Sequence, residues 1–283
     1  MKLQDARFID VHYHAGPDAF VRRHGALEAG RQYAAYDGWV VLKNHLGCSA
    51  AQAWEARQEG LPVSGSVVLN EIAGGVDFRV VQRSLCLHGD SPARLIVHLP
   101  TVTGRKHTSS LKREIGHSLL QHSPILPTTV SCDGQLTKAA QDILRMARDY
   151  PIVISTGHAN ADEIDLLVDA AVCFQVPRLM LNQPANPLTG LDARALRDLA
   201  EVPSVYAEQT ALTYLLGYQP WEDFEAVLKT VPRALYSSDL GQTSQMDVQS
   251  WLGKTAEWFE SMQLSNTLKR SVTFEQALQM LQH

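Results

Sequence analysis

The sequence predicts an α/β fold, a (β/α)8 barrel of the TIM-barrel type, on three observations. Short apolar segments alternate with amphipathic segments along the chain. Eight of the apolar segments end near residues 12, 45, 69, 98, 158, 182, 208 and 239, and most of these ends are separated by the length of one strand plus one helix. The chain has 283 residues, close to the usual length of such a barrel, about 250.

The expected strands are residues 8–14, 39–45, 62–69, 93–98, 151–158, 178–182, 204–208 and 234–239. The expected helices are residues 27–36, 50–57, 77–87, 137–149, 160–172, 192–200, 221–231, 248–262 and 273–281. We expect one domain over residues 1–283, with the C-terminal helices from about 245 to 283 packed on the barrel. A doubly wound open sheet is the alternative, but no glycine-rich nucleotide-binding turn follows the first strand.

Two local features refine this prediction. Asn160 and Glu163 have the spacing of a capping box and indicate the start of a helix. The longest interval between strand ends, from 98 to 158, contains a polar stretch over residues 101–135. Long irregular segments within compact domains are typical of lids and binding loops.

Composition excludes several kinds of function. A net charge of −5 and a pI near 6.1 give no basic surface for nucleic acid. No apolar run approaches the roughly 18 residues of a membrane span, and the first residues lack an apolar signal segment, so we expect a cytoplasmic protein. The four cysteines lie far apart, and we expect them to be reduced and packed.

The first strand contains two histidines that indicate a metal site. His12 and His14 are two residues apart, and on a strand both imidazoles therefore point to the same face. Neutral imidazole is a common ligand for transition metals. Two surface histidines could have the same spacing. The interpretation of this pair as a metal site therefore depends on the residues that the other strands contribute.

The ends of the other strands contribute further potential ligands. If the barrel forms, the carboxyl ends of its strands meet at one mouth, where such barrels place their active sites. The residues at these ends are His12, His14, Lys43, His45, Asn70, His98, His158, Asn182, Glu208 and Asp239. So many ligand-type side chains favour a metal centre over chance placement.

With these motifs in place, the chain resembles the amidohydrolase superfamily of metal-dependent hydrolases. The matching residues are His12, His14, His158 and Asp239. Further segments are similar to a little-characterised bacterial branch of amidohydrolase-like proteins: residues 9–18, 41–45, 68–70, 99–102, 156–158 and 238–242. The resemblance spans nearly the whole chain.

The resemblance implies two divalent metal ions, zinc, iron or manganese, bridged by a lysine that CO2 has carboxylated. It implies His12, His14, His158 and Asp239 as ligands. The bridging lysine usually ends strand four, but here that strand ends in His98 and the candidate is Lys43. Asn182 replaces the usual strand-six histidine, and His45 could supply the missing nitrogen.

Charge supports N6-carboxylation of Lys43. A bare ammonium among imidazoles and metal ions is costly to bury, whereas its carbamate is an anion that bridges two ions. An uncarboxylated Lys43 that binds a substrate anion is the alternative.

The remaining candidates have less specific signals. Asp239 is expected to ligate metal and accept the proton of a water, with His107 as a hydrogen-bond donor over the substrate. Glu208 is a metal ligand, a support for one, or a carboxylate paired inside the barrel. His98 is a ligand or a core histidine, and the others, His24, His88, His117, His122 and His283, are expected at the surface. The expected substrate-binding residues are Asn70, Thr101, Asn182 and Arg105.

The sequence therefore predicts a hydrolase that cleaves an amide, lactam, ester, lactone or thioester of a small molecule. The alternatives are a phosphoesterase, a lyase or decarboxylase with one metal ion, and a barrel that binds without catalysis. The expected partners are a small-molecule substrate and other copies of the chain, without nucleic acid or membrane.

Overall fold

The computed structural model describes residues 1–105 and 111–283 and shows an α/β fold with parallel sheets. The first sheet has the order β1-β2-β3, with bounds Phe8–His14, Gly38–Lys43 and Val63–Ser64. The second has the order β11-β10-β9-β8-β5-β4, with bounds Ala234–Ser237, Val205–Thr210, Leu179–Leu181, Ile152–Ser155, Leu95–His98 and Ser66–Val68. All neighbouring strands within these two sheets pair in parallel.

The two sheets meet at both edges. Beyond the end of β11, Asp239 N donates to His12 O at 2.9 Å, and His14 N donates to Leu240 O at 2.8 Å. At the other edge, only Gly65 separates β3 from β4, and a Cβ on Gly65 would lie 2.5 Å from the Ala50 Cα. The lack of a side chain at Gly65 therefore lets the chain pass from one sheet to the other beside α2.

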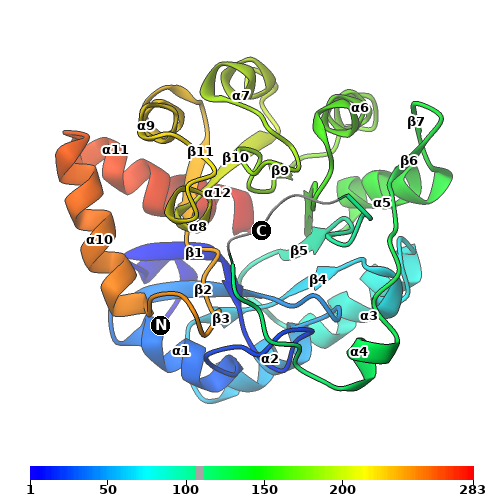
Figure 1. Cartoon of the computed structure of the whole chain (residues 1–283), viewed down its shortest axis with the longest axis horizontal. Helices are drawn as coiled ribbons and strands as arrows, with labels where there is room; N and C mark the ends of the chain where they lie inside the picture. Colours follow the sequence, from blue (N-terminus) through cyan, green and yellow to red (C-terminus); the bar gives the residue numbers. More distant parts are fainter. Residues whose placement is uncertain (106–110) are drawn as a thin grey trace.

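Helices surround the strands, as Figure 1 shows. The larger ones are α1 Ala26–Ala34, α2 Ala50–Gln58, α3 Phe78–His88, α5 Lys138–Asp149, α6 Ala161–Cys173, α7 Ala193–Leu199, α9 Trp221–Thr230 and α10 Val248–Ser261. Asn160 forms the predicted capping box with Glu163 at the start of α6. None of the helices within the described ranges is long and apolar enough to cross a membrane.

Shorter elements complete the chain. They are η1 Leu3–Asp5, η2 Glu71–Ala73, α4 Leu119–His122, α8 Ala211–Leu215, α11 Asn266–Arg270, the π-helix η3 Ser271–Glu275, α12 Gln276–Leu281 and the hairpin β6 Ser131–Cys132 with β7 Gln135–Leu136. Sequence analysis did not predict η1, α4, α8, α11 or the hairpin, because each is too short to show a clear period.

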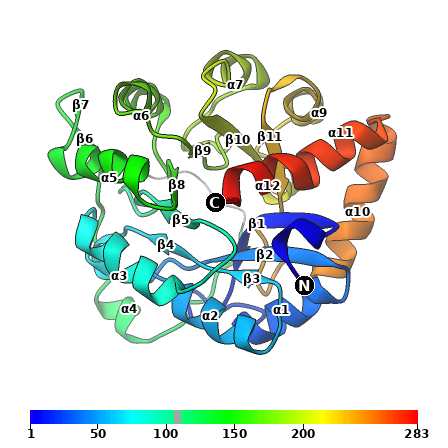
Figure 2. The same cartoon turned by 180° about the vertical axis from the view of Figure 1, so that it is seen from behind.

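The strands are buried on both faces, as expected for parallel sheets covered by helices. Alternate residues pack together between the two sheets: Ile9, Val11, Trp39, Val41, Ile96, Val153, Met180 and Leu235. Phe274, Ala277, Met280 and Leu281, from η3 and α12, belong to the same cluster. Figure 2 shows α12 against the strands from behind.

Two predictions about single residues are wrong. The cysteines are free, as expected, but Cys86, Cys132 and Cys173 are exposed rather than packed. His88 is 3% exposed rather than at the surface. Its Nε2 lies 2.9 Å from the Ala93 carbonyl oxygen, so the end of α3 is fixed to the start of β5. Spacing alone did not show that the last turn of α3 faces the core.

The buried His88 predicts a loss of stability in acid. Burial lowers the pKa of His88 from 6.5 to about 4. In the unfolded chain, His88 therefore becomes protonated near pH 6.5, whereas in the folded chain it becomes protonated only near pH 4. Protonation of His88 thus favours unfolding. We expect this histidine to remove about 2 kcal/mol of unfolding free energy between pH 7 and pH 5. Urea unfolding of His88→Gln should show a smaller loss over this range. The exposed His122→Gln is the control, and an unchanged pH dependence in His88→Gln would contradict the assignment.

Candidate metal centre

Strand β1 presents two imidazoles to one interior face. His12 and His14 are 0% and 4% exposed, and their ring centroids lie 5.2 Å apart. The alternation of side chains along β1 produces this arrangement, as predicted from the sequence. The Nε2 atom of His12 makes no well-oriented hydrogen bond to a described residue, although the Asp239 carboxylate lies close to it, and the Nδ1 atom of His14 makes none either.

Asp239 completes a three-residue cluster. Its Oδ1 lies 3.1 Å from the Nε2 of His12 and 3.1 Å from the Nε2 of His14. The residue has a φ of 52°, an uncommon value for a side chain larger than glycine. Gly241 follows closely, and a Cβ there would lie 1.9 Å from the His14 carbonyl oxygen. The tight turn after β11 therefore aims Asp239 at the two histidines.

Electrostatic interactions link Asp239 to His12 and His14. Burial opposes charge on His12, but the carboxylates of Asp239 and Glu208 raise its pKa to about 9. Burial, with nearby Arg22, lowers the pKa of His14 well below its usual value. Although burial also opposes charge on Asp239, the two histidines hold its pKa well below the usual range. Asp239 is therefore an anion that faces two potential nitrogen ligands.

Glu208 supports His12 from behind. Its Oε1 lies 2.9 Å from the Nδ1 of His12 and accepts from the Ser237 hydroxyl at 2.7 Å, while its Oε2 accepts from the Gln183 amide at 2.9 Å. A carboxylate on one ring nitrogen fixes the tautomer and leaves the other nitrogen as a ligand. Glu208 is therefore paired with His12 inside the molecule, a contact that is compatible with support of a metal ligand.

Lys43 lies next to Asn182. The Lys43 ammonium donates to Asn182 Oδ1 at 2.9 Å, and Nδ2 of the same amide has no partner among the described residues. Burial lowers the pKa of Lys43 to about 8, despite the nearby carboxylates of Glu208 and Asp239. A substantial fraction of the amine is therefore neutral near pH 8.

His45 is held by two residues that sequence analysis did not include in the site. The Nδ1 of His45 lies 3.1 Å from Asp18 Oδ2 and 3.1 Å from the Arg22 guanidinium, which lies 2.6 Å from the same Asp18 oxygen. The ring of His45 stacks on that of His14, with centroids 4.7 Å apart.

Asp18 could have been suspected from the sequence, because it belongs to a segment that carried the family resemblance. Arg22, however, comes from an irregular stretch without a pattern. His14, Asp18 and His45 also form a possible metal-binding group. The guanidinium of Arg22 lies between Asp18 and His45 and supplies a positive charge to this second set of residues. A metal ion is therefore not needed there to balance the Asp18 carboxylate.

The other predicted residues surround the cluster. Asn70 donates to the His45 carbonyl at 2.9 Å and accepts from the Thr101 amide at 2.8 Å, so it joins two strand ends. His158 Nε2 lies 3.2 Å from the Gln183 side-chain nitrogen. Arg105 donates to the His158 carbonyl and forms an ion pair of 2.8 Å with Glu163. His107 lies outside the described residues.

Of the two roles expected for His98, a metal ligand or a core histidine, its surroundings match a core histidine more closely. It is fully buried, and its Nδ1 lies 2.8 Å from the Ser155 hydroxyl. Its Nε2 has no partner in the described part of the chain, and its ring centroid is 6.2 Å from that of His12. It therefore lies beside the cluster rather than inside it.

A cavity of about 440 Å³ opens onto the cluster. Asp239, His45 and His158 line it, together with Thr101 and Gln183. Other walls are Phe20, Val102, Thr103, Gly104, Arg105, Arg113, Asn186, Leu188, Leu212, Thr213, Leu216 and Tyr218. A small molecule in this cavity would contact the candidate metal centre directly.

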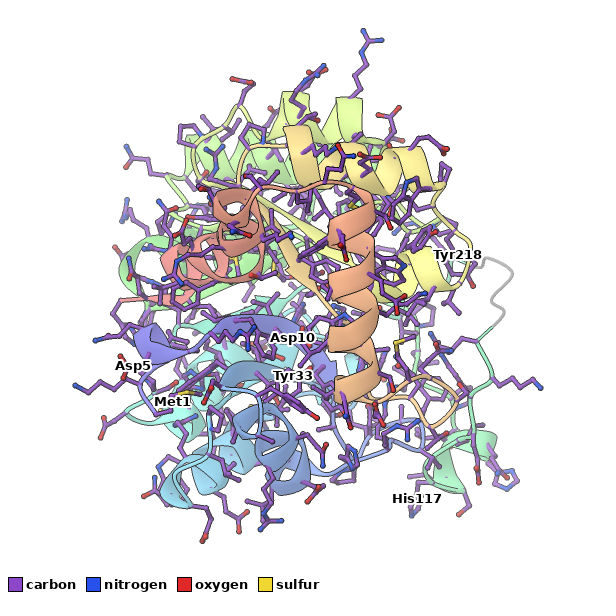
Figure 3. The ribbon with its side chains drawn as sticks, turned by 90° about the vertical axis from the view of Figure 1, so that its left-hand side faces the viewer. Met1, Asp5, Asp10, Tyr33, His117 and Tyr218 are labelled. Carbon is purple, nitrogen blue, oxygen red and sulfur yellow. The ribbon has the colours of Figure 1, made fainter. Side chains whose placement is uncertain are left out.

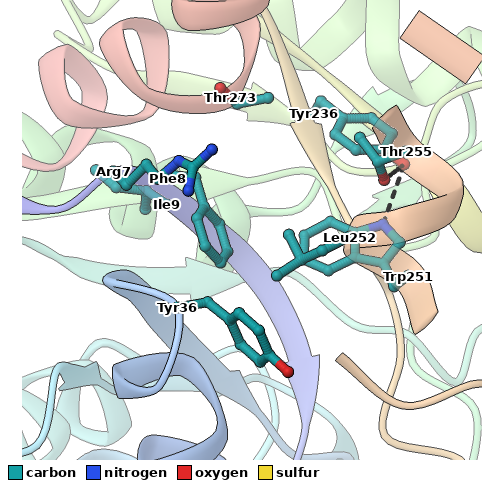
Figure 4. Close-up of a pocket in the computed structure, with 9 residues that line it drawn as sticks. All are labelled: Arg7, Phe8, Ile9, Tyr36, Tyr236, Trp251, Leu252, Thr255 and Thr273. Atoms are coloured by element: carbon teal, nitrogen blue, oxygen red, sulfur yellow. Dashed lines mark hydrogen bonds between the residues drawn. The ribbon is translucent and has the colours of Figure 1, made fainter. Parts of the chain in front are cut away.

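A second cavity, of about 260 Å³, has a different character. Figure 4 shows it between β1, α10 and the residues after α11, with walls that include Phe8, Tyr36, Tyr236 and Trp251. Its nine lining residues include no histidine, cysteine or carboxylate. Of these two cavities, only the first is lined by histidine and carboxylate side chains.

Comparison with known families identifies the chain. A model of a family of unknown function, DUF6282, matches residues 7–208. The chain belongs to this family. The match includes β1 to β9 and most of β10, and thus every candidate ligand except Asp239. No curated protein matches this DUF6282 chain.

Solved structures show that the fold is shared. A protein of Pseudomonas putida, provisionally named a 2-pyrone-4,6-dicarboxylic acid hydrolase, has a TM-score of 0.57 and 15% identity, over 99% of this chain and 98% of its own. An amidohydrolase from Burkholderia multivorans with bound HEPES has a TM-score of 0.48 and 13% identity, over 97% and 99%. The monotopic membrane protein (S)-mandelate dehydrogenase has a TM-score of 0.44 and 12% identity, over 97% and 80%. Only the first is similar enough to carry an argument, and it concerns the fold.

Asp10 holds the strands of the DUF6282 site together. Its Oδ1 accepts from the backbone amides of His12 at 3.1 Å and Ser238 at 3.0 Å, and its Oδ2 accepts from the Tyr33 hydroxyl. Figure 3 shows Asp10 and Tyr33 close together inside the molecule. One buried carboxylate thus joins β1, α1 and the residues after β11.

We expect Asp10→Ala to lower the unfolding free energy by about 2–4 kcal/mol, since three buried donors lose their acceptor. Urea unfolding measures this loss. Asp198→Ala is the control, because Asp198 is an exposed carboxylate on α7 and should change stability by less than about 0.5 kcal/mol. Equal effects in the two variants would show that Asp10 does not hold the strands.

Proposed function

We propose that this DUF6282 protein is a metal-dependent hydrolase that cleaves an amide, lactam, ester, lactone or thioester in a small molecule. The observation that carries the proposal is the cluster of His12, His14 and Asp239. The buried Nε2 of His12 faces the Asp239 carboxylate at 3.1 Å without a well-oriented hydrogen bond to any described residue, and a buried polar atom in this state is costly. A divalent cation bound by Nε2 of His12 would remove that cost and would complement the Asp239 carboxylate.

The spacing of the three donors fits a metal ion. Ligands about 2.0–2.1 Å from a tetrahedral zinc ion lie about 3.3 Å from one another. Each of the two Nε2 atoms is 3.1 Å from Asp239 Oδ1. Glu208 already fixes the tautomer of His12, so little rearrangement is needed for binding.

The residues then divide the chemistry. A bound divalent ion lowers the pKa of a water molecule and polarises a carbonyl oxygen. Asp239 lines the cavity and is ionised, so with an ion bound it would be placed to take up a proton from water and pass it to the leaving group. His158, His45 and Gln183 line the same cavity and are available to orient a substrate.

A second ion would require a carboxylated Lys43. The neutral amine attacks CO2, forms an N–C bond and releases one proton, which gives a carbamate anion. The lowered pKa of Lys43 supplies the neutral amine, and Nδ2 of Asn182, which has no partner among residues 1–105 and 111–283, could donate to the new oxygens. His158 would be a further nitrogen ligand.

We propose that the two sheets form one closed (β/α)8 barrel and one domain. The backbone hydrogen bonds at Asp239 and His14 and the continuity through Gly65 support closure. So does the similarity to a solved hydrolase over nearly the full length of both chains. The fold alone does not fix a reaction, so the proposal rests on the side chains.

A site with one metal ion, hydrolytic or lyase, is the second candidate. The observation in its favour is the position of Arg22, whose guanidinium fills the second possible metal group at Asp18 and His45. Because Arg22 already neutralises Asp18 beside His45, His12, His14 and Asp239 are the set most available to bind a metal ion. The number of ions per chain separates the two candidates.

Replacing both β1 histidines should remove the metal. We expect His12→Ala with His14→Ala to lose bound zinc, iron or manganese and all turnover, because two of three ligands are gone. Elemental analysis and a panel of amides, lactones and thioesters measure this. The control is the double change at exposed His117 and His122. Metal and turnover that survive the β1 change would show that the site is wrong.

Lys43→Ala tests the carbamate. We expect at least a tenfold fall in turnover, since the variant loses the bridging anion, and partial rescue by added formate or acetate. Lys43→Met should fall in the same way but resist rescue, because its side chain fills the space. Normal activity in Lys43→Ala without additives would remove Lys43 from the mechanism.

A further inference from the structure

Two arginines, Arg105 and Arg113, line the cavity, and a third, Arg22, lies next to the lining residue His45. Arg22 pairs with Asp18 at 2.6 Å, and Arg105 pairs with Glu163 at 2.8 Å. Arg113 lines the same cavity, but no carboxylate in the described ranges lies within 4.0 Å of it. Its contact is with Phe20, whose ring centroid lies 5.1 Å from the guanidinium carbon.

The backbone around Arg113 is held in place. Val21 N donates to Glu114 O at 2.9 Å, and Gly116 N donates to Ala19 O at 2.8 Å. On the other side, the Ser244 hydroxyl donates to Lys112 O at 3.1 Å. Hydrogen bonds thus join the segment that carries Arg113 to residues 19–21, which lie much earlier in the sequence, and to the loop after β11.

Packing leaves this segment little freedom. A Cβ on Gly116 would lie 2.4 Å from the Asp18 carbonyl oxygen, so only glycine permits this contact. Phe20, on the paired turn, contacts the His45 ring edge-on at 5.7 Å. The backbone at Arg113 is therefore fixed near Phe20 and His45, while the Arg113 side chain is exposed and contacts the Phe20 ring.

Arg113 and Asp239 are lining residues of one cavity, with apolar walls from Phe20, Leu212 and Leu216. A ligand with its reacting carbonyl at Asp239 would pass these apolar side chains and meet Arg113. A guanidinium has planar, paired donors that match a carboxylate in a bidentate manner. The ring of Phe20 supports the guanidinium by a cation–π contact.

We propose that Arg113 binds a carboxylate of the substrate, so that the substrate is an anionic carbonyl compound with a small apolar body. This proposal rests on the hydrolase function proposed above. It assigns the anion to Arg113 rather than to Arg105, whose charge Glu163 already neutralises. The carboxylate that binds Arg113 is not the group that reacts.

Benzoate and benzamide provide a test that requires no turnover. The two molecules have nearly the same shape, and only benzoate carries a charge. We would measure their Kd by calorimetry with the metal-loaded wild type, with Arg113→Gln and with Lys112→Gln. Lys112 is the matched control, because it is an exposed adjacent cation that does not line the cavity.

We expect wild type and Lys112→Gln to bind benzoate about tenfold or more tightly than benzamide, and Arg113→Gln to lose this preference. Equal binding of the two molecules by the wild type would overturn the proposal. A preference that survives in Arg113→Gln would also overturn it. If that surviving preference then disappears after treatment with a chelator, the metal ion binds the anion, and the proposed hydrolase site stands without Arg113.

Discussion

The buried carboxylate of Asp10 is the constraint on which the rest of the site depends. It accepts backbone amides from His12 and Ser238 and the hydroxyl of Tyr33. These donors belong to the first strand, to the turn after the last strand and to the first helix, so one side chain fixes the relative position of both ends of the strand order. Burial raises the pKa of Asp10. Because His12 and Asp239 lie directly beside these contacts, their separation is set by the scaffold rather than by a ligand.

Polar groups deeper in the site follow the same principle. Glu208 is satisfied by His12, Ser237 and Gln183, and Asp18 by Arg22 and His45. By contrast, the atoms without partners in the described ranges include Nε2 of His12 and Nδ2 of Asn182. A protein interior normally satisfies its buried polar groups, so orphaned atoms gathered at one place indicate a ligand. The atoms of His12 and Asn182 lie beside Asp239 and Lys43, whereas those of His88 and Gln276 lie elsewhere, and the first pair explains why a metal ion and a modified lysine are proposed at this place.

Sequence patterns predicted the parts of the molecule that regular periods control. Alternation along β1 placed His12 and His14 on one face, and the strand ends placed Asp239, Lys43 and Asn182 near them. The larger helices also appeared, within a few residues of their predicted bounds. Asp18 and Arg22 were not assigned to the site, and Arg113 was not singled out, because all three lie in irregular segments whose positions come from long-range backbone pairing. His88 was misplaced because one buried contact at the end of a helix leaves no periodic signal.

The central claim is that a divalent metal ion binds between His12, His14 and Asp239. Anomalous diffraction at the zinc edge, from crystals of the full chain grown with zinc, tests it most directly. The account predicts a peak within about 2.0–2.2 Å of Nε2 of His12, Nε2 of His14 and an oxygen of Asp239. A peak elsewhere in the chain, or no peak after zinc has been supplied, would contradict it.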